Sequence, residues 1–265
     1  MNIEGITKEV IELTNTVGKY IQAEREKLTS ENVEKKGLHD FVTYVDKNAE
    51  EKLVKGLQNI LPEAGFIVEE ETIEKKGQRF NWIVDPLDGT TNYIHGLTPF
   101  AISIALADHD KIVMGVVNEL GFEEVFYSWG DNKAFRDGKP IRVSKVESLK
   151  ESMIATGFPY NNFTRLQPFL KSLEHLMRNT HGIRRFGSAA TDLVYTACGR
   201  FEGFYEYSLK PWDVAAGAFI VQQAGGVVSD FKGGEDYLYG QAIVAASDKI
   251  FEEFKGTIKN FFHGE

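Results

Sequence analysis

The chain is poor in cysteine, in long apolar runs and in clustered positive charge. Cys198 is the only cysteine among 265 residues, which excludes an internal disulfide and a cysteine-rich zinc cluster. No run of about 18 apolar residues is present to predict a membrane span, and the N-terminal stretch lacks a signal-peptide core. We therefore expect a cytoplasmic globular protein that needs no membrane partner.

The charge balance argues against a nucleic-acid-binding protein. Thirty-nine acidic residues face thirty basic ones, a formal net charge of −9, and no basic track interleaved with aromatic residues is visible. Hydrophobic residues make up 42% of the chain, enough for a sizeable core in one large domain or two intimate subdomains. Divalent metal ions would offset part of the negative charge.

The most informative segment is residues 82–92, WIVDPLDGTTN. An apolar run delivers Asp85 to a predicted strand end, since Pro86 disfavours helical geometry in the residue before it. Asp88 can then fold back beside Asp85, while Gly89 and the polar residues after it offer a turn and N–H groups for an anion. Isolated, such a pattern is commonly an Asx turn, but the full run favours a Mg²⁺ and phosphate site.

The first half of the chain reads as helices followed by strands. Apolar residues from Ile6 onward recur at helical spacing and predict a first helix that ends near Leu28 or Thr29. Residues 41–45 are predicted to be a short extended piece. Asp46 is predicted to N-cap a second helix, which a proline and a glycine close.

Strands and helices then alternate. Residues 65–68 form a predicted strand that ends in the acidic run 69–71, a pattern that is usually just a solvated loop. Residues 101–135 read as an antiparallel meander with polar turns. A polar stretch at 145–150 predicts a junction, so the chain is expected to be one domain, 1–265, with possible subdomains 1–147 and 148–265.

Two helix starts stand out in the second half. Ser188 is a predicted N-cap of a helix that contains Cys198 as a small core residue, and Pro211 is predicted at the first position of another helix. Asp213 then lies in a first helical turn. The helix dipole alone favours an acid there by about 0.3–1 kcal/mol, so a metal role is one of two explanations.

Taken together, residues 66–70, 85–92 and 211–217 resemble the inositol monophosphatase family of magnesium-dependent, lithium-sensitive phosphatases. Further positions also match, in the order expected for the family: Asp46, 187–190, Glu206 and 225–228. The resemblance spans the whole chain. It implies an α/β fold, a layered α/β/α/β/α sandwich of the sugar-phosphatase type, and it agrees with the alternation described above.

The resemblance also implies a site for two to three Mg²⁺ ions. Asp85, the backbone carbonyl of Leu87 and Glu69 would surround the first ion, and Asp85, Asp88 and Asp213 the second. A third, weaker ion would use Glu69 and water. Crowded carboxylates repel each other unless cations join them, and two close metals suit an in-line displacement at phosphorus.

The implied catalytic group is small. A metal-activated water would attack phosphorus, oriented by Thr90 with Asp46 and Glu69, so that no covalent phosphoenzyme forms. The backbone N–H groups of Gly89 and Thr90 would hold the phosphate oxygens. The chain departs from the family pattern before Glu69, where Val68 replaces the usual glycine, and Glu70 remains the alternative metal ligand.

The implied substrate is a small phosphorylated polyol. Its hydroxyl groups would be bound by Asp88, Glu206 and the segment Gly187, Ser188 and Ala189. The residues after Gly89 favour inositol monophosphate. The alternatives are a broad sugar or nucleotide phosphatase acting on fructose 1,6-bisphosphate, NADP or 3′-phosphoadenosine 5′-phosphate, and a non-catalytic regulatory protein. The family resemblance further implies a homodimer.

Overall fold

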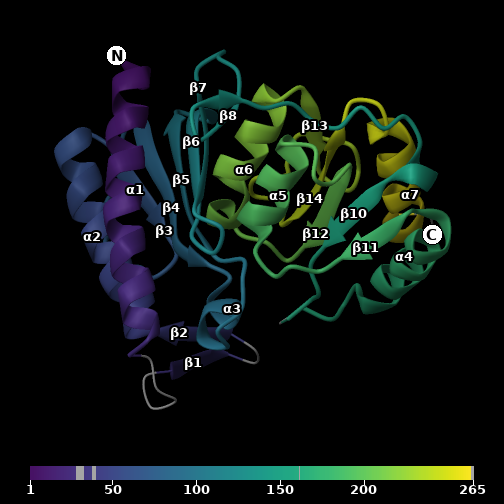
Figure 1. Cartoon of the computed structure of the whole chain (residues 1–265), viewed down its shortest axis with the longest axis horizontal. Helices are drawn as coiled ribbons and strands as arrows, with labels where there is room; N and C mark the ends of the chain where they lie inside the picture. The colour runs from purple at the N-terminus through teal and green to yellow at the C-terminus, as the bar shows by residue number, and fades with distance from the viewer. Residues whose placement is uncertain (28–32, 38–39, 161, 264–265) are drawn as a thin grey trace.

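The computed structural model describes residues 1–27, 33–37, 40–160 and 162–263. It has two main β-sheets and a two-stranded hairpin (Figure 1). The helices are α1 (Ile3–Arg25), α2 (Tyr44–Ile60), α3 (Thr90–Ile94), α4 (Leu166–Asn179), α5 (Ala189–Ala197), α6 (Pro211–Gln223) and α7 (Phe251–His263). A short 3-10 helix spans Leu149–Glu151.

The larger sheet has seven strands in the order β3-β4-β5-β6-β7-β8-β9. These are β3 (Gly65–Val68), β4 (Phe80–Asp88), β5 (Ala101–Asp108), β6 (Lys111–Glu119), β7 (Glu124–Trp129), β8 (Phe135–Arg136) and β9 (Lys139–Pro140). β3 pairs with β4 in parallel, and every later pair is antiparallel. The predicted meander is therefore present.

The smaller sheet has five strands in the order β11-β10-β12-β14-β13. These are β10 (Met153–Thr156), β11 (Gly182–Arg184), β12 (Gly203–Tyr207), β13 (Gly226–Ser229) and β14 (Ala242–Ser247). The two strands of the separate hairpin are β1 (Val33–Gly37) and β2 (Asp40–Thr43). Sheet strands therefore switch from the larger to the smaller sheet between Pro140 and Met153, around the predicted junction. The division into subdomains stays a prediction.

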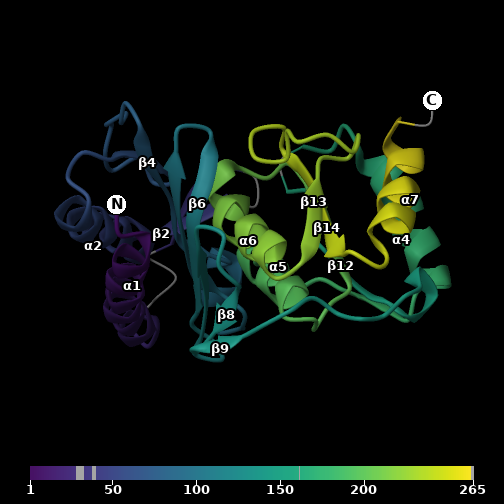
Figure 2. The same cartoon turned by 90° about the horizontal axis from the view of Figure 1, so that it is seen from above.

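The elements stack in five layers, which Figure 2 shows from above. Helices α1 and α2 cover the outer face of the larger sheet, α5 and α6 fill the space between the sheets, and α4 and α7 cover the far face of the smaller sheet. The predicted α/β/α/β/α sandwich is confirmed. Among the helices of the described residues, none combines the length and the apolar composition that a membrane span requires.

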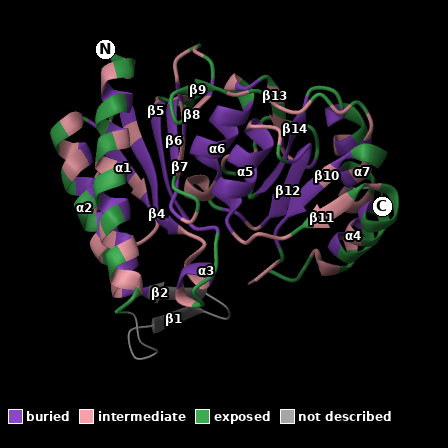
Figure 3. Cartoon of the chain, in the orientation of Figure 1, coloured by how far each residue is buried: buried purple, intermediate pink, exposed green. Residues whose placement is uncertain are grey.

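Helices α5 and α6 form the most buried layer, visible in Figure 3 as two purple helices between the sheets. Every residue of α5 is buried, and so are residues 214–221 of α6. The predicted N-cap Ser188 and first-turn Pro211 are confirmed. Cys198 differs from the expectation, because it caps the end of α5 and is only partly buried.

Helix α1 also differs from its predicted end, since it stops at Arg25. Leu28 and Thr29 lie outside the described residues. Helix α2 ends at Ile60, before the proline, as expected.

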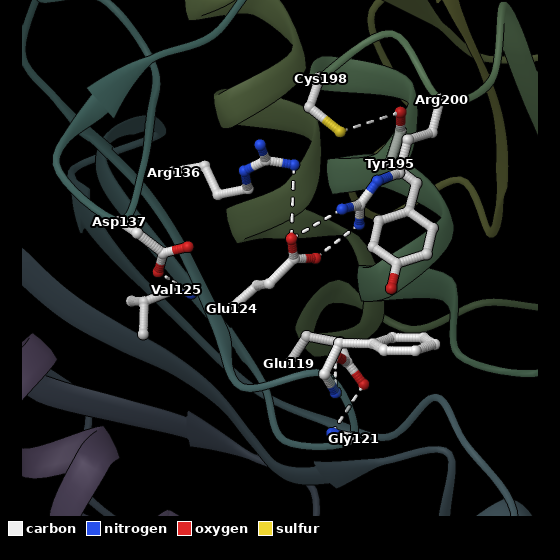
Figure 4. Close-up of polar contacts among 10 residues, drawn as sticks. Glu119, Gly121, Glu124, Val125, Arg136, Asp137, Tyr195, Cys198 and Arg200 are labelled. Carbon is white, nitrogen blue, oxygen red and sulfur yellow. Dashed lines mark hydrogen bonds and ion pairs between the residues drawn. The ribbon is translucent and has the colours of Figure 1, made fainter.

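An ion-pair network joins the larger sheet to the chain that follows α5 (Figure 4). Glu124 at the start of β7 accepts two hydrogen bonds from Arg200, at 2.5 and 2.6 Å, and lies 3.3 Å from Arg136 of β8. Nearby, Glu119 is buried and accepts from the backbone N–H of Gly121. These contacts fix the turn between β6 and β7 against the central helices.

Candidate active site

Strand pairing brings the first two acidic segments together. In the parallel pair β3 and β4, the last paired residues are Val68 and Val84. The residues that follow them, Glu69 and Asp85, therefore lie side by side just beyond this pairing. An acid from the run 69–71 is thus placed beside the central motif. This proximity, rather than any property of Glu69 alone, distinguishes it from an ordinary solvated acid.

The sequence predicted Asp85 at the end of a strand. This prediction is wrong, because β4 continues to Asp88. Asp85 lies opposite Ser103 and Asp88 opposite Ala101, so two residues of β4 face one residue of β5. Such an irregularity is a β-bulge, and Pro86 suits it because proline has no N–H to donate to the ladder. The bulge bends the strand and allows two carboxylates three residues apart to approach one region.

Asp85 is almost fully buried among other acids. Burial raises its pKa well above the ordinary value, and the charges of Glu69, Asp88 and Asp213 raise it further. A hydrogen bond with Glu69 acts in the same direction, while Asp85 Oδ1 accepts the N–H of Leu87 at 2.9 Å. The four predicted carboxylate ligands therefore lie within electrostatic reach of one another.

Thr90 and Asp46 form a hydrogen-bonded pair next to this cluster. Thr90 Oγ1 lies 2.9 Å from Asp46 Oδ1 and 2.9 Å from the carbonyl oxygen of Leu87. Burial raises the pKa of Asp46. Asp46 is not the N-cap of α2: Thr43 takes that position, and Asp46 accepts both its N–H and its hydroxyl as the third helical residue of a capping box.

Asp88 is held by the start of α5. Its Oδ2 accepts a hydrogen bond from Ser188 Oγ at 2.7 Å and another from the N–H of Ala190 at 2.7 Å. Burial raises the pKa of Asp88 to about 6, although these bonds and the charge of Arg185 oppose the rise. Ser188 itself is buried and lies behind Asp88, so its observed contact is with a predicted ligand.

Asp213 and Glu206 approach from the second half of the chain. Asp213 lies in the first turn of α6 and its Oδ2 accepts the N–H of Lys210 at 2.7 Å. Glu206 at the end of β12 is buried, and burial together with the charges of Asp213 and Asp88 raises its pKa well above the ordinary value. Gly157 makes room for it, because a Cβ there would collide with the Glu206 carboxylate.

These side chains surround a pocket of about 440 Å³. The predicted site residues that line it are Glu69, Asp88, Gly89, Thr90, Gly187, Ala189, Glu206 and Asp213. Asp46, Asp85, Leu87 and Ser188 are not at the pocket surface and lie in or behind its wall. Glu69 lines the pocket, whereas Glu70 uses its backbone N–H to anchor the loop, which favours Glu69 over Glu70 as the ligand.

The donors suit a hard divalent cation, but they do not form a finished coordination sphere. Carboxylate oxygens and one backbone carbonyl are the ligands that Mg²⁺ prefers. Within the described part of the chain, no three His, Cys, Asp or Glu side chains are arranged as a ready metal site. Asp85, Asp88 and Asp213 each accept hydrogen bonds from protein donors through one oxygen, which is compatible with metal binding because a carboxylate offers about four acceptor sites.

Glu50 is a site residue that the sequence reading missed. It is fully buried in α2, where its Oε2 accepts the N–H of Glu70 at 2.7 Å. Its Oε1 accepts the N–H of Thr72 at 2.9 Å and the Thr72 hydroxyl at 2.7 Å. Glu50 therefore fixes the loop that carries Glu69. One signal was available, because Glu50 lies one turn after Asp46 on the apolar face of the predicted helix.

Several other residues that line the pocket were not among the predicted site residues, and Phe158, Tyr160 and Arg185 are three of them. Asp192 lies within electrostatic reach of Arg185, is buried in α5 and has no hydrogen-bond partner for either oxygen among the described residues. No local pattern marks these positions, since they meet only when β10, β11 and α5 pack together. In the sequence, Asp192 is distinguished only as the one acidic residue of the helical run 189–197.

With this geometry established, comparison with known proteins identifies the family. The model of the inositol monophosphatase family matches residues 2–260, and the chain belongs to this family. It is 39% identical to the Nus factor SuhB of Pseudomonas aeruginosa over 249 residues, 92% of each chain. It is 38% identical to the inositol-1-monophosphatase of Mesorhizobium japonicum over 225 residues, 84% of this chain and 85% of that protein.

Solved structures agree with this assignment. The extragenic suppressor protein suhB of Bartonella henselae superposes with a TM-score of 0.90 at 36% identity, covering 96% of this chain and 98% of that one. The IMPase TM1415 of Thermotoga maritima gives a TM-score of 0.86 at 34% identity, covering 95% of both chains. The chain thus has a phosphatase family's fold over its whole length.

Proposed function

We propose that this chain is a Mg²⁺-dependent phosphomonoesterase that hydrolyses inositol monophosphate to inositol and phosphate. The observation that carries the proposal is the convergence of four carboxylates, the buried Asp85 and three others near it, beside the Thr90 and Asp46 pair. These carboxylates come from the loop after β3, from β4 and from α6. Family membership and the names of the inositol-1-monophosphatase relatives support the same reaction.

Glu69, Asp85, Asp88, Asp213 and the Leu87 carbonyl would hold two to three Mg²⁺ ions. Bound there, Mg²⁺ would make water acidic and neutralise charge that develops on the phosphoryl group and on the leaving oxygen. The carboxylates already raise one another's affinity for protons, which is the electrostatic condition that a cation relieves.

The remaining residues would orient the reactants. Thr90, bonded to Asp46, would align the attacking water through its hydroxyl, and Asp46 would receive the proton through it. The backbone N–H groups of Gly89 and Thr90 would donate to phosphate oxygens. Glu206, Gly187 and Ala189 line the part of the pocket where the alcohol would lie, so they would accept or donate to its hydroxyl groups.

The test is phosphate release from inositol 1-phosphate with Mg²⁺ and with a chelator, for the wild type and for Asp88→Asn. Asp110→Asn is the matched control, since Asp110 is exposed and far along the chain from every site residue. We expect Mg²⁺-dependent turnover that only Asp88→Asn abolishes. Comparable rates on fructose 1,6-bisphosphate, NADP and 3′-phosphoadenosine 5′-phosphate would instead establish a broad phosphatase.

A second candidate function follows from the names of the relatives. Proteins 37–39% identical to this chain are named Nus factor SuhB as well as inositol-1-monophosphatase, so a regulatory role through binding is the alternative. Such a role would not need turnover. No phosphate release from any ester in the panel, with the fold intact, would favour it.

The proposal includes lithium inhibition, a cytoplasmic location and a homodimer. Leu97 and Phe122 are exposed large apolar residues, and their segments meet where Gly121 packs on Thr98. Exposed apolar side chains that lie close together are typical of contact surfaces. Sedimentation of the wild type and of Phe122→Ser tests the dimer: we expect the variant to shift toward monomer, and a monomeric wild type would contradict it.

A further inference from the structure

Three segments that are distant in the sequence meet at the side chain of Asn92, which does not line the active-site pocket. Asn92 lies in α3 and is only 7% exposed. Its Nδ2 group donates to the carbonyl oxygen of Pro99 at 2.8 Å and to that of Phe186 at 2.7 Å. Its own backbone carbonyl accepts the N–H of Leu97 at 2.8 Å. One buried residue thus joins the chain that follows α3 to the chain that precedes α5.

The joined segments approach each other at Gly89. A Cβ at Gly89 would lie 3.0 Å from the carbonyl oxygen of Pro99 and 3.3 Å from that of Gly187. A Cβ at Gly187 would lie 3.4 Å from Asn92 Nδ2. Both glycines have a positive φ, which glycine adopts without a steric penalty. Because protein interiors are closely packed and transmit strain, a shift of one segment at this junction displaces the others.

The segment bonded to Asn92 leads directly to the support of Asp88. Ser188 and Ala190 follow Phe186 by two and four residues, and both donate to Asp88 Oδ2 at 2.7 Å. Because Asn92 holds the Phe186 carbonyl, it fixes the start of the segment that presents these two donors. Hydrogen-bond partners of a metal ligand commonly change metal affinity by about 10- to 100-fold. Asn92 lies one step further from the ligand.

The other segment bonded to Asn92 reaches the molecular surface. Leu97 is 58% exposed, and Arg25 of α1 donates to its carbonyl oxygen at 2.7 Å. The two acceptors of the Asn92 side chain are both carbonyl oxygens, so this position requires two N–H donors from one group. An asparagine supplies them, whereas an aspartate of the same shape supplies none.

We propose that Asn92 is a positioning residue that couples the exposed segment 97–99 to the Asp88 ligand. It acts through Phe186 and the donors at the start of α5, and it touches neither substrate nor metal. A contact that fixes Leu97 would strengthen cation binding at Asp88. Binding at Asp88 would in turn order Leu97, because coupling between two sites is reciprocal. This inference rests on the proposed role of Asp88 as a metal ligand.

The first test is a calorimetric titration with Mg²⁺ in the absence of substrate. Asn92→Ala removes both side-chain hydrogen bonds and should raise the Kd for Mg²⁺ by about 5- to 30-fold. An unchanged Kd would overturn the inference.

Asn118→Ala is the matched control. Asn118 of β6 is 3% exposed, and its Nδ2 also has two acceptors, Thr14 Oγ1 at 3.4 Å and Asn15 Oδ1 at 3.0 Å. It does not line the pocket. Its loss should lower the melting temperature as Asn92→Ala does, while the Kd for Mg²⁺ stays at the wild-type value. An equal rise in Kd for both variants would show a merely structural role and overturn the inference.

Hydrogen exchange in the wild type supplies a second measurement, which stands even if Asn92→Ala fails to fold. Mg²⁺ should slow exchange of the Ala190 N–H, which is bonded to Asp88, and also of the Leu97 N–H, which is bonded to Asn92. Leu97 does not line the pocket, so its protection reports the coupling. Slower exchange at Ala190 alone would overturn it.

The outcomes separate this inference from the function beneath it. A wild type that binds Mg²⁺ as tightly as Asn92→Ala would overturn the coupling and leave the proposed function standing. A wild type that binds no Mg²⁺ would overturn the proposed function. In that case, exchange of the Ala190 N–H without metal decides the positioning role: faster exchange in Asn92→Ala than in Asn118→Ala would support it, and equal exchange would overturn it.

Discussion

Glu50 offers the sharpest test of how the acidic loop is positioned. The change Glu50→Gln keeps the size of the side chain and removes one carboxylate oxygen. With its remaining oxygen toward Thr72, the glutamine turns an NH₂ group toward the N–H of Glu70, which now has no acceptor. Two donors then face each other where the Glu50 side chain is fully buried and the Glu70 backbone is partly buried.

The magnitude follows from the bond that is lost. A hydrogen bond to a charged group contributes about 1.5–3 kcal/mol, and a buried unpaired donor costs about 1–3 kcal/mol. Because these two effects overlap, we expect Glu50→Gln to lower the free energy of unfolding by about 2–4 kcal/mol. At about 2–4 °C per kcal/mol for chains approaching this size, the melting temperature should fall by about 4–16 °C.

The same change should loosen Glu69, which lies next to Glu70. We expect the Mg²⁺ concentration for half-maximal activity to rise about 5- to 30-fold, while kcat at saturating Mg²⁺ stays within about threefold, because Glu50 does not line the pocket. Thermal unfolding in chelator and a Mg²⁺ titration of phosphate release measure the two effects.

Glu51→Gln is the matched control, since it is the next residue of α2 and is exposed. It should change the melting temperature and the Mg²⁺ requirement very little. If Glu50→Gln matched this control in both assays, the loop would not depend on Glu50, and the reasoning would be refuted.

Three other changes test separate parts of the structure. Gly157→Ala should displace Glu206 and raise KM at least tenfold with the Mg²⁺ requirement unchanged; an unchanged KM would contradict this. Burial raises the pKa of Asp192, so the folded chain holds this proton to a higher pH than the unfolded chain does. The Asp192 carboxyl therefore lowers the free energy of unfolding as pH rises above about 4, the ordinary pKa of an aspartate. Asp192→Asn should therefore gain stability over wild type by up to about 1.4 kcal/mol per pH unit in that window in urea unfolding, and parallel pH profiles would exclude it. Glu124→Gln should cost about 1 kcal/mol in the same assay, because it weakens the partly exposed contact with Arg200, and an unchanged midpoint would show that the network contributes nothing.

Local signals made much of the fold and site predictable. Pro86 marked a change in β4, Ser188 and Pro211 marked helix starts, and each of these features depends on neighbours a few residues away. The acids at such positions became candidate ligands only through the family resemblance, because local signals alone left Glu69 a solvated acid and Asp213 an acid favoured by the helix dipole. Even the error at Asp46 was local: a threonine three residues before an acid is a capping-box pattern, and it places Asp46 inside the helix.

Contacts between distant segments were not predictable in the same way. Glu50 bonds to a loop 20 residues away, and Phe158 meets Arg185 across two neighbouring strands. Sequence periodicity shows which face of an element is apolar, but not which other element covers it. The depth of burial that raises the pKa values of Asp85 and Asp192 is likewise a property of the assembled layers.

The central helices explain how mutually repelling acids are kept close. A Cβ at Gly115 of β6 would lie 2.8 Å from the carbonyl oxygen of Ala216, so α6 packs directly on the larger sheet. Gly217, one residue further, gives the same close approach to α5. These contacts set the position of the first turn of α6 and therefore of Asp213. Because the carboxylates repel one another, their proximity depends on the apolar packing of this layer, which offsets the repulsion. A bound cation would relieve that repulsion.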